Sequence, residues 1–291
     1  MTLDPACVTI SVVTPSLDQV AFLPDAVESV ALQSHPAVEH LVIDAVSTDG
    51  TVEYLAGRED VDWVSEPDGG QSDALNKGFL RVQGDVIAWL NADDRYRPGA
   101  FAAVAEYFAT HPETDVLYGD ITWIDRDGVV FEHRPSLDFD RFSLRYLHWL
   151  TIPSPATFFR SSIVRDGHLI DTSYQYAMDY EFFLRLANEG YRFAHVAETL
   201  ADFRLQPDAK TGVGSERQLR EHRQAAIDRN DLLQRLPAAL QVPTWQALSL
   251  VARGQRVIRR ARAGHYDAAM RPGPRPDYLA RPAPWARAAS S

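Results

Sequence analysis

The sequence predicts an α/β fold in which a doubly wound, mostly parallel sheet has helices on both faces, followed by a helical C-terminal extension. Short runs of β-branched apolar residues alternate with segments of helical periodicity through the first third of the chain. This strand–helix alternation is typical of parallel sheets. The chain has 291 residues, 45% apolar and 24% charged, which suits one large globular domain with an appendage.

The first strand and helix have the clearest patterns. Residues 8–14 form a continuous β-branched, apolar run up to Pro15, as expected for a fully buried strand. Residues 21–33 have apolar side chains at helical spacing. The same patterns then predict a strand at 39–44, a helix at 51–56 after a capping turn, a strand at 62–65, a helix from 69 to about 81 and a strand at 85–90.

The second half is less regular. The elements predicted there are a helix at 100–110, short strands at 116–118 and 121–124, a return strand at 129–132 after a turn, a helix at 179–189, a strand at 191–196 and a polar helix at 216–236. We therefore predict a main domain over residues 1–214 and a helical extension over 215–270. Residues 271–291 are rich in Pro, Ala and Arg and are predicted to be a disordered tail.

The charge of the chain is unevenly distributed. Its formal net charge is −11, but residues 241–291 contain nine arginines and two acidic residues, a net charge of +7. Residues 1–240 therefore carry −18. An acidic body argues against general binding of nucleic acid.

Three sequence features bear on the compartment. Cys7 is the only cysteine, which excludes an internal disulfide and a cysteine-cluster metal site and fits a reducing environment. No apolar run approaches the roughly 18 residues of a membrane span. The first residues lack the basic and apolar regions of a secretory signal. We expect a cytoplasmic protein.

The extension contains a basic amphipathic segment. Within residues 245–263, apolar side chains are interspersed with five arginines. This pattern fits a helix docked on the acidic body, and it also fits a segment that rests on anionic lipid. The second interpretation predicts a peripheral contact with an anionic membrane, through residues 241–265, on its cytoplasmic face.

Polar side chains follow each of the first four predicted strands. Ligands of open α/β sheets bind beyond the carboxyl ends of the strands, so these side chains mark the candidate site. They are Ser16 and Asp18, next to Pro15, after the first strand, Asp44, Ser47 and Asp49 after the second, Glu66, Asp68, Gln71 and Asp73 around the third, and Asn91, Asp93 and Asp94 after the fourth.

The acidic segment at residues 91–94 directly follows an apolar strand that has no lysine to neutralise it. Oxygen ligands in this position suit Mg²⁺ or Mn²⁺, which usually takes one or two carboxylates plus substrate phosphates. The chain lacks the motifs G-x-x-x-x-G-K-[ST], G-x-S-x-G and H-E-x-x-H, and no G-x-G-x-x-G follows the first strand. A P-loop enzyme, a serine hydrolase, a zincin and a dinucleotide oxidoreductase are therefore excluded.

Four sequence motifs occur here in a distinctive order. They are TPSLDQ at residues 14–19, VIDAVSTDGT at 42–51, SEPDGGQSDALNKG at 65–78 and GDVIAWLNADD at 84–94. Together they resemble the family 2 glycosyltransferases, which have the GT-A fold. The resemblance continues with less force through AMDYE at 177–181 and FRLQPDAKT at 203–211, and it does not extend beyond about residue 215.

This resemblance implies an enzyme that transfers a sugar from a nucleotide-diphosphate donor to an acceptor hydroxyl, with inversion at the anomeric carbon. Such enzymes commonly build cell-surface polysaccharides or glycolipids, so the implied acceptor is a saccharide or a lipid-linked molecule. Asp93 would contact the Mg²⁺ or Mn²⁺ that bridges the diphosphate. The implied donor-binding residues are Thr14, Pro15, Ser16, Asp18, Asp44, Ser47, Gln71, Asp73, Asn76, Lys77 and Asn91.

The resemblance also implies a general base. Asp179 aligns with the acceptor-side carboxylate of the family and opens a predicted helix. A carboxylate within hydrogen-bond reach is sufficient to take the proton of an acceptor hydroxyl. Glu181 is the second candidate, and Asp120 and Asp171 are the next carboxylates to consider.

The sequence departs from the family pattern at three places. Asn91 stands at the first D-x-D position, Ala45-Val46 replaces a small pair, and Gln206 stands where relatives often have His. The charge missing at Asn91 favours, as an alternative, a non-catalytic relative that binds sugar nucleotides. A nucleotidyltransferase is the other alternative, but it usually has a glycine-rich loop with Arg or Lys after the first strand, and residues 15–20 have neither.

Overall fold

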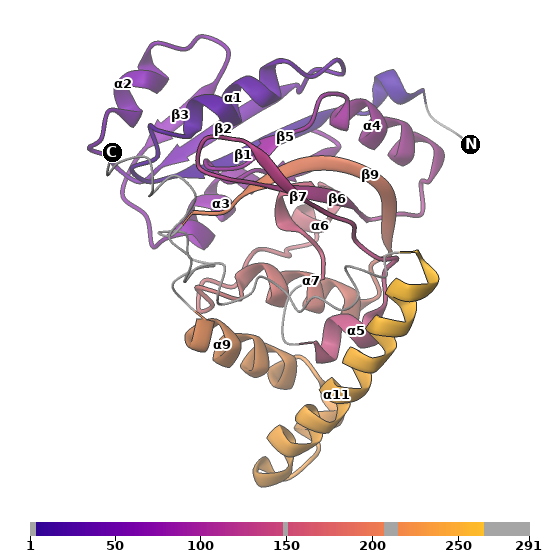
Figure 1. Cartoon of the computed structure of the whole chain (residues 1–291). Helices are drawn as coiled ribbons and strands as arrows, with labels where there is room; N and C mark the ends of the chain where they lie inside the picture. Colours follow the sequence, from indigo (N-terminus) through magenta and orange to yellow (C-terminus); the bar gives the residue numbers. More distant parts are fainter. Residues whose placement is uncertain (1–3, 148–150, 207–214, 265–291) are drawn as a thin grey trace, which may run out of the picture.

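The computed structural model describes residues 4–147, 151–206 and 215–264. In these residues one sheet with helices on both faces forms the body, and three further helices follow it (Figure 1). The strand order is β3-β2-β1-β4-β8-β6-β9-β5, and β7 pairs with β6. The predicted α/β class and helical C-terminal segment are confirmed. The predicted tail at 271–291 and residues 265–270 of the extension lie outside the described residues.

The first half of the sheet is parallel, as predicted. β1 (Ile10–Ser16) lies between β2 (Glu39–Asp44) and β4 (Val86–Trp89), and β3 (Asp62–Ser65) pairs with the other side of β2. Every residue of β1 is buried. Its position in the middle of a sheet covered on both faces explains the continuous apolar run in the sequence.

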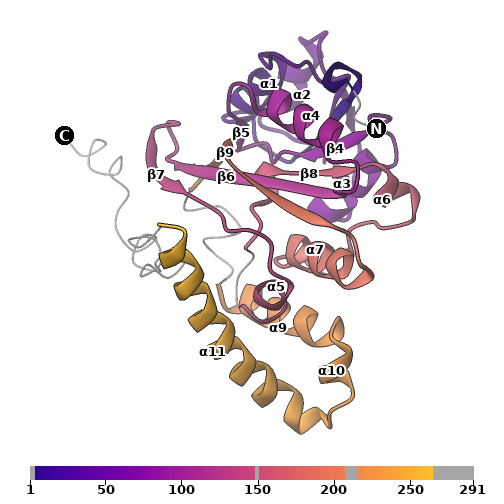
Figure 2. The same cartoon turned by 90° about the vertical axis from the view of Figure 1, so that its right-hand side faces the viewer.

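Helices cover both faces of the sheet (Figure 2). On one face lie α1 (Leu23–Ala31), α2 (Thr51–Ala56) and α4 (Ala100–Thr110). On the other face lie α3 (Gln71–Phe79) and α7 (Met178–Glu189). The carboxyl ends of β1, β2 and β4 therefore lead into loops that start the flanking helices, where ligands of such sheets bind.

The second half adds antiparallel pairs, so the sheet as a whole is mixed. β8 (Thr157–Arg160) is antiparallel to β4 and to β6 (Val116–Ile124). β9 (Phe193–Arg204) is parallel to β6 and antiparallel to β5 (Arg95–Tyr96). β7 (Val130–Arg134) forms the predicted hairpin with β6.

β6 runs through the two short strands predicted at 116–118 and 121–124. Gly119, between them, allows the close approach of β9, because a Cβ there would lie 2.5 Å from Leu200 Cγ. β9 bulges at this point, since Tyr118 pairs with His195 whereas Asp120 pairs with Thr199. The bulge interrupts the alternation of side chains, so the sequence pattern at 191–196 covers only the start of β9.

Some short elements have no clear sequence signal. They are η1 (Pro5–Cys7), α5 (Arg141–Tyr146), η2 (Ser154–Ala156), α6 (Ser162–Arg165) and the strands β5 and β8. Each spans too few residues to show a helical or strand period, and the pairing of β5 and β8 with longer strands determines their structure.

The C-terminal helices are α9 (Ser215–Asp228), α10 (Asp231–Gln234) and α11 (Ala238–Arg262). The helix predicted at 216–236 is broken at Asn230, whose side chain accepts hydrogen bonds from the amides that open α10. Ala225, Leu233 and Trp245 belong to the same apolar core as residues of α7. The domain boundary at 214/215 stays a prediction. In the ranges that the structure describes, no helix is both long and apolar enough to cross a membrane.

A buried polar pair joins β1 to β2. Thr14 Oγ1 and His40 Nε2 lie 2.9 Å apart, and both side chains are buried. Burial lowers the pKa of His40 to about 4, although the negative charge of Asp60 opposes this shift. The folded protein therefore holds a neutral imidazole at this place.

This pair predicts a window of acid sensitivity. The ordinary pKa of His40 is 6.5, so between pH 6.5 and about 4 the unfolded chain binds a proton that the folded chain does not. The stability that comes from the difference in the pKa of His40 is complete above pH 6.5. It is lost as the pH falls to about 4, by up to about 3 kcal/mol in the free energy of unfolding. Urea unfolding at a series of pH values measures this slope. We expect His40→Gln to flatten it and His133→Gln, at an exposed position, to leave it unchanged. An equally steep slope in His40→Gln would contradict the assignment.

Candidate active site

The loops that follow β1 and β2 are bonded to each other. Asp44 ends β2 and is fully buried. It accepts hydrogen bonds from Ser47 N at 3.0 Å, from Ser47 Oγ and from Ser65 Oγ at 2.6 Å. Ser47 Oγ in turn accepts from Asp18 N at 2.8 Å, and Asp18 Oδ1 accepts from Thr48 N at 2.8 Å. The structure thus brings together Asp18, Asp44 and Ser47, three of the predicted donor-binding residues.

Ser16 carries an unsatisfied polar atom at this edge of the sheet. It ends β1 directly opposite Asp44, and its Oγ is buried with no hydrogen-bond partner among the described residues. A buried hydroxyl without a partner is costly, so this atom has hydrogen-bonding capacity that the described residues do not use. The side chain of Thr14, in contrast, is bonded to His40, and Pro15 is buried within β1.

The loop after Asp44 is strained. Val46 has φ 62°, in the left-handed region that β-branched residues rarely adopt. Its side chain is 49% exposed, so core packing does not hold it there. Asp18 has φ 50°, which an Asp tolerates better. Backbone strain of this kind is concentrated at functional sites in proteins.

Four predicted donor-binding residues lie on α3. Gln71 Nε2 donates to Asn91 Oδ1 at 2.8 Å, and Asp73 accepts from Gly69 N at 2.9 Å. Both ends of the Asn76 amide bond the backbone of Ile170. Lys77 Nζ donates to Pro67 O at 2.9 Å and pairs with Glu66 at 3.2 Å and Asp73 at 3.5 Å. Gln71 therefore lies at the acidic segment, whereas the amide of Asn76 connects α3 to the chain before α7.

Asn91 forms hydrogen bonds at both ends of its amide. Its Oδ1 accepts from Gln71 Nε2 at 2.8 Å and from Trp89 Nε1 at 2.9 Å, and its Nδ2 donates to Asp94 Oδ2 at 2.9 Å. A carboxylate at position 91 could not donate to Asp94. The amide is therefore suited to a site where the neighbouring carboxylate is already buried.

Asp93 and Asp94 are both in low-dielectric surroundings. Burial raises the pKa of Asp93, although a hydrogen bond from Gln206 Nε2 at 2.9 Å opposes this shift. The pKa of Asp94 is well above its ordinary value because of burial and then because of the charge on Asp93. Asp94 Oδ1 accepts from Arg204 N at 2.9 Å. Asp93 is the more exposed of the two carboxylates, so it is the one that can reach a ligand.

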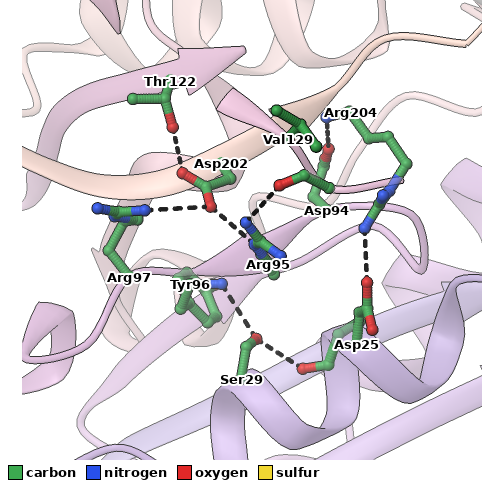
Figure 3. A network of polar contacts seen from close by, with 12 residues as sticks. Asp25, Ser29, Asp94, Arg95, Tyr96, Arg97, Thr122, Val129, Asp202 and Arg204 are labelled. Atoms are coloured by element: carbon green, nitrogen blue, oxygen red, sulfur yellow. Dashed lines mark hydrogen bonds and ion pairs between the residues drawn. The ribbon is translucent and has the colours of Figure 1, made fainter. Parts of the chain in front are cut away.

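Arg204 lies beside the acidic segment, with its backbone N on Asp94 and its guanidinium on Asp25 (Figure 3). Its side chain is only 1% exposed. The guanidinium donates to the backbone oxygens of Asp93 at 2.8 Å, Asp125 at 3.1 Å and Arg126 at 2.6 Å, and to the carboxylate of Asp25 at 2.9 Å. This side chain therefore connects the acidic segment, the β6–β7 turn and α1.

Sequence reasoning misses Arg204, although a signal was present. Within residues 201–204, Asp202 and Arg204 alternate with the apolar residues Ala201 and Phe203. Asp202 is also fully buried, and it accepts from Thr122 Oγ1 and from Arg95 Nε at 2.7 Å (Figure 3). Charged residues at alternate positions of a central strand indicate a buried polar network.

The donor set around Asp93 decides whether a divalent metal fits here. In the parts of the chain that the structure describes, no group of three His, Cys, Asp or Glu side chains could hold a metal ion. Asp93 offers one carboxylate, to which the neutral amide of Gln206 is bonded, and the neighbouring carboxylate of Asp94 is buried and bonded to Asn91 and to Arg204 N. Mg²⁺ is commonly bound by one or two carboxylates together with substrate phosphates. These residues therefore fit a metal that arrives with a diphosphate rather than a preformed protein site.

Asp179 lies in the first turn of α7 and is partly exposed. Its Oδ1 accepts from Tyr180 N at 2.7 Å. Ser72, the residue after Gln71, donates through Oγ to Met178 Sδ at 2.9 Å. Consecutive residues at the start of α3 therefore contact the acidic segment and the start of α7, which brings Asp179 to the same end of the sheet as Asn91.

The other candidate bases are engaged elsewhere. Glu181 is completely buried and pairs with Arg185 Nε and Arg229 Nε, each at 2.8 Å. Asp120 bonds His195 Nε2 at 2.8 Å, and Asp171 pairs with Arg229 at 3.2 Å. These carboxylates serve to hold segments of the fold together.

The strain at Val46 predicts a stabilising substitution. Glycine adopts φ 62° without steric cost, so Val46→Gly should raise the free energy of unfolding by about 1 kcal/mol, after the greater freedom of the unfolded chain is counted. Ala45→Gly is the matched control, because Ala45 has no positive φ and should lose up to about 1 kcal/mol. Thermal and denaturant unfolding of both variants measure the difference. A loss of stability in Val46→Gly equal to that in Ala45→Gly would refute the assignment of strain.

Comparisons with known proteins are consistent with this geometry. An uncharacterized glycosyltransferase of Mycobacterium tuberculosis is 35% identical over 189 residues, which cover 62% of this chain and 69% of that protein. A PGL/p-HBAD biosynthesis glycosyltransferase of Mycobacterium bovis is 26% identical over 262 residues, 86% of this chain and 93% of that protein. The crystal structure of TarS residues 1–349 of S. aureus with UDP-GlcNAc has the same fold, with a TM-score of 0.59 at 16% identity over 90% of this chain and 89% of that chain.

The family comparison covers the loops of the candidate site that follow β1, β2 and β4. The sequence model described as Glycosyl transferase family 2 matches residues 11–167, which is more than half of the chain and includes the loops after β1, β2 and β4. The chain belongs to glycosyl transferase family 2.

Proposed function

We propose that this glycosyltransferase moves a sugar from a nucleotide-diphosphate donor to an acceptor hydroxyl with inversion at the anomeric carbon. One observation carries the proposal: Gln71 and Ser72 at the start of α3 contact the acidic segment and the start of α7, respectively. A site for the donor diphosphate and a carboxylate for the acceptor then lie on adjoining elements. This arrangement supports a single displacement, in which no covalent sugar–enzyme intermediate is needed.

The donor would bind at the carboxyl ends of β1 and β2. The buried, unpartnered hydroxyl of Ser16 and the loop bonded through Asp44 and Ser47 support a nucleotide there. TarS was solved with UDP-GlcNAc, which makes a nucleotide sugar a reasonable class of donor for the same fold. Gln71 and Asn91 would line the side of the diphosphate. Thr14 and Asn76 would contribute through the backbone or by holding the loops, because their side chains are already bonded within the protein.

Asp179 would act as the general base. The acceptor oxygen attacks the anomeric carbon, the bond from that carbon to the diphosphate oxygen breaks, and the hydroxyl proton passes to the carboxylate of Asp179. The nucleoside diphosphate leaves on the opposite side of the sugar, which inverts the configuration. A partly exposed carboxylate at the start of α7 is accessible to an acceptor, whereas the enclosed Glu181 is not.

A divalent metal, Mg²⁺ or Mn²⁺, would supply positive charge to the leaving diphosphate when bound. Asp93 would hold it, with the neutral amide of Gln206 bonded to the Asp93 carboxylate. Arg204 would keep the backbone of Asp93 in place, because its guanidinium bonds the Asp93 carbonyl.

The acceptor is proposed from the relatives. The M. bovis relative is named for PGL/p-HBAD biosynthesis. A saccharide or lipid-linked acceptor in the synthesis of cell-surface polysaccharide or glycolipid is the corresponding proposal for this chain. Such chemistry would take place on the cytoplasmic side of a membrane, and the contact predicted for residues 241–265 would bring the enzyme to it.

The role of Asp179 is tested by Asp179→Asn, which keeps the shape and removes the proton acceptor. Transfer should fall by roughly 10²–10⁴. The affinity for nucleotide sugar should stay unchanged, because the proposed donor site lies in the loops after β1, β2 and β4 and not on α7. Product analysis by mass spectrometry and donor titration by calorimetry measure the two quantities.

Glu181→Gln is the control. It should lower the free energy of unfolding by about 3 kcal/mol, since Arg185 and Arg229 lose a buried partner, but keep transfer per folded molecule. Normal transfer by Asp179→Asn would show that Asp179 is not the general base.

The metal proposal is tested at Asp93. We expect Asp93→Ala to abolish transfer, because the charge of the leaving diphosphate is no longer compensated, and to abolish the enhancement of nucleoside diphosphate binding by Mn²⁺ in calorimetry. Binding without metal should persist in this variant. Undiminished transfer in excess EDTA would overturn the metal proposal.

If the wild-type chain binds nucleotide sugars but neither transfers nor hydrolyses any of a broad panel, the non-catalytic alternative replaces the proposed function.

A further inference from the structure

α11 has an inner face that packs on the body. Trp245, Ser249, Ala252 and Arg260 are buried there, and the helix lies against α5, α9 and α10. Docking on the body, one of the two interpretations of the sequence, therefore accounts for this side of the helix. It leaves the opposite side of α11 unexplained.

The outer face of α11 carries exposed apolar side chains. Leu240, Leu250, Val251, Val257 and Ile258 are exposed by 52, 67, 51, 41 and 53% of their surface. Single exposed residues of this kind are ordinary, but a contiguous group on one helix indicates an interaction surface. Figures 1 and 2 show α11 as the outermost helix of the described chain, along one side of the molecule.

Helical geometry places these residues in one stripe. With about 100° per residue, positions 240, 243, 247, 250, 251, 254, 257, 258 and 261 fall within an arc of about 120°. The buried residues 245, 249, 252 and 260 are centred on the opposite side of the helix. We call this arc the outer stripe. Its small residues Ala247, Gly254 and Ala261 give it an even surface between the larger side chains.

The charges around the outer stripe have one sign. Arg253 and Arg262 are exposed and flank the arc on its two edges, about 40° and 20° beyond it. Residues 238–262 contain no acidic side chain at all, in contrast to the acidic body. An apolar arc with an arginine on each edge matches a surface that is apolar inside and anionic at its rim.

We infer that the outer stripe of α11 rests on a membrane surface rich in anionic phospholipid. The apolar side chains enter the boundary between headgroups and acyl chains, and Arg253 and Arg262 pair with lipid phosphates. A second copy of the chain fits less well, because two such helices packed through their stripes would bring arginines together with no carboxylate on either helix. The inference rests on the proposed function in one respect only: a lipid-linked acceptor gives the membrane contact its use.

Vesicle flotation of the full chain tests the inference. Vesicles of phosphatidylcholine and phosphatidylglycerol in equal parts should carry the protein at low salt, and vesicles of phosphatidylcholine alone should not. Raising the salt should weaken the binding, since the arginine–phosphate attraction is screened. Leu250→Glu combined with Ile258→Glu should lower the affinity for anionic vesicles by roughly tenfold or more, because charges replace apolar contacts.

A matched control separates the stripe from general charge effects. Leu32→Glu combined with Val38→Glu adds the same two charges at two apolar residues that are 72% and 55% exposed but lie outside α11. This variant should float like the wild type. Equal loss of binding in both double variants, or no flotation of the wild type, overturns the inference. So does a wild-type dimer, detected by light scattering, that the α11 double variant converts to a monomer.

The flotation assay needs no sugar donor, so its outcome is independent of transfer. Asp179→Asn should float like the wild type. A chain that floats through α11 but transfers no sugar overturns the proposed function and leaves the membrane contact standing. A chain that transfers sugar to a soluble acceptor but does not float overturns the membrane contact and leaves the proposed function standing.

Discussion

The guanidinium of Arg204 is the contact on which the site depends most. It is buried, and it donates to backbone oxygens of the acidic segment and of the β6–β7 turn. It also donates to the carboxylate of Asp25 in α1. Arg204 N holds Asp94 as well. Because a buried cation must have its hydrogen-bonding groups satisfied, the loss of any one of these segments would leave donors of Arg204 without a partner. The position of Asp93 at the sheet edge is therefore set from β9, a strand that comes more than a hundred residues later in the chain.

The parallel half of the fold and the loops after β1, β2 and β4 could be predicted because their signals are local. A β-branched run such as residues 8–14 indicates a buried strand from composition alone, and the motif around Asp44 lies within one loop. The place of the acidic segment, directly after β4, could be predicted in the same way, because an apolar run precedes it in the sequence. The predicted elements in residues 8–110 agree in type and order with β1 to α4 of the structure, apart from the two-residue strand β5.

The rest of the site could not be predicted because it depends on pairing between distant residues. Glu181 and Asp179 both open the same helix, and no local pattern tells which of them is enclosed by Arg185 and Arg229. The β9 bulge and the short strand β8 likewise arise from contacts across the sheet. For α11, periodicity alone could not show that the helix has a docked face and, opposite to it, an exposed apolar one.

The ion pair between Glu181 and Arg229 has a consequence for the order in which the protein is made. The parallel strands β1 to β4 are all synthesised within the first 90 residues of the chain. Helix α7, however, obtains Arg229 and the apolar cover of Ala225 and Trp245 only after the C-terminal helices have been synthesised. The surroundings of Glu181 at the start of α7 are therefore completed last, so a chain without the C-terminal helices would lack one of the two arginines that pair with this buried carboxylate.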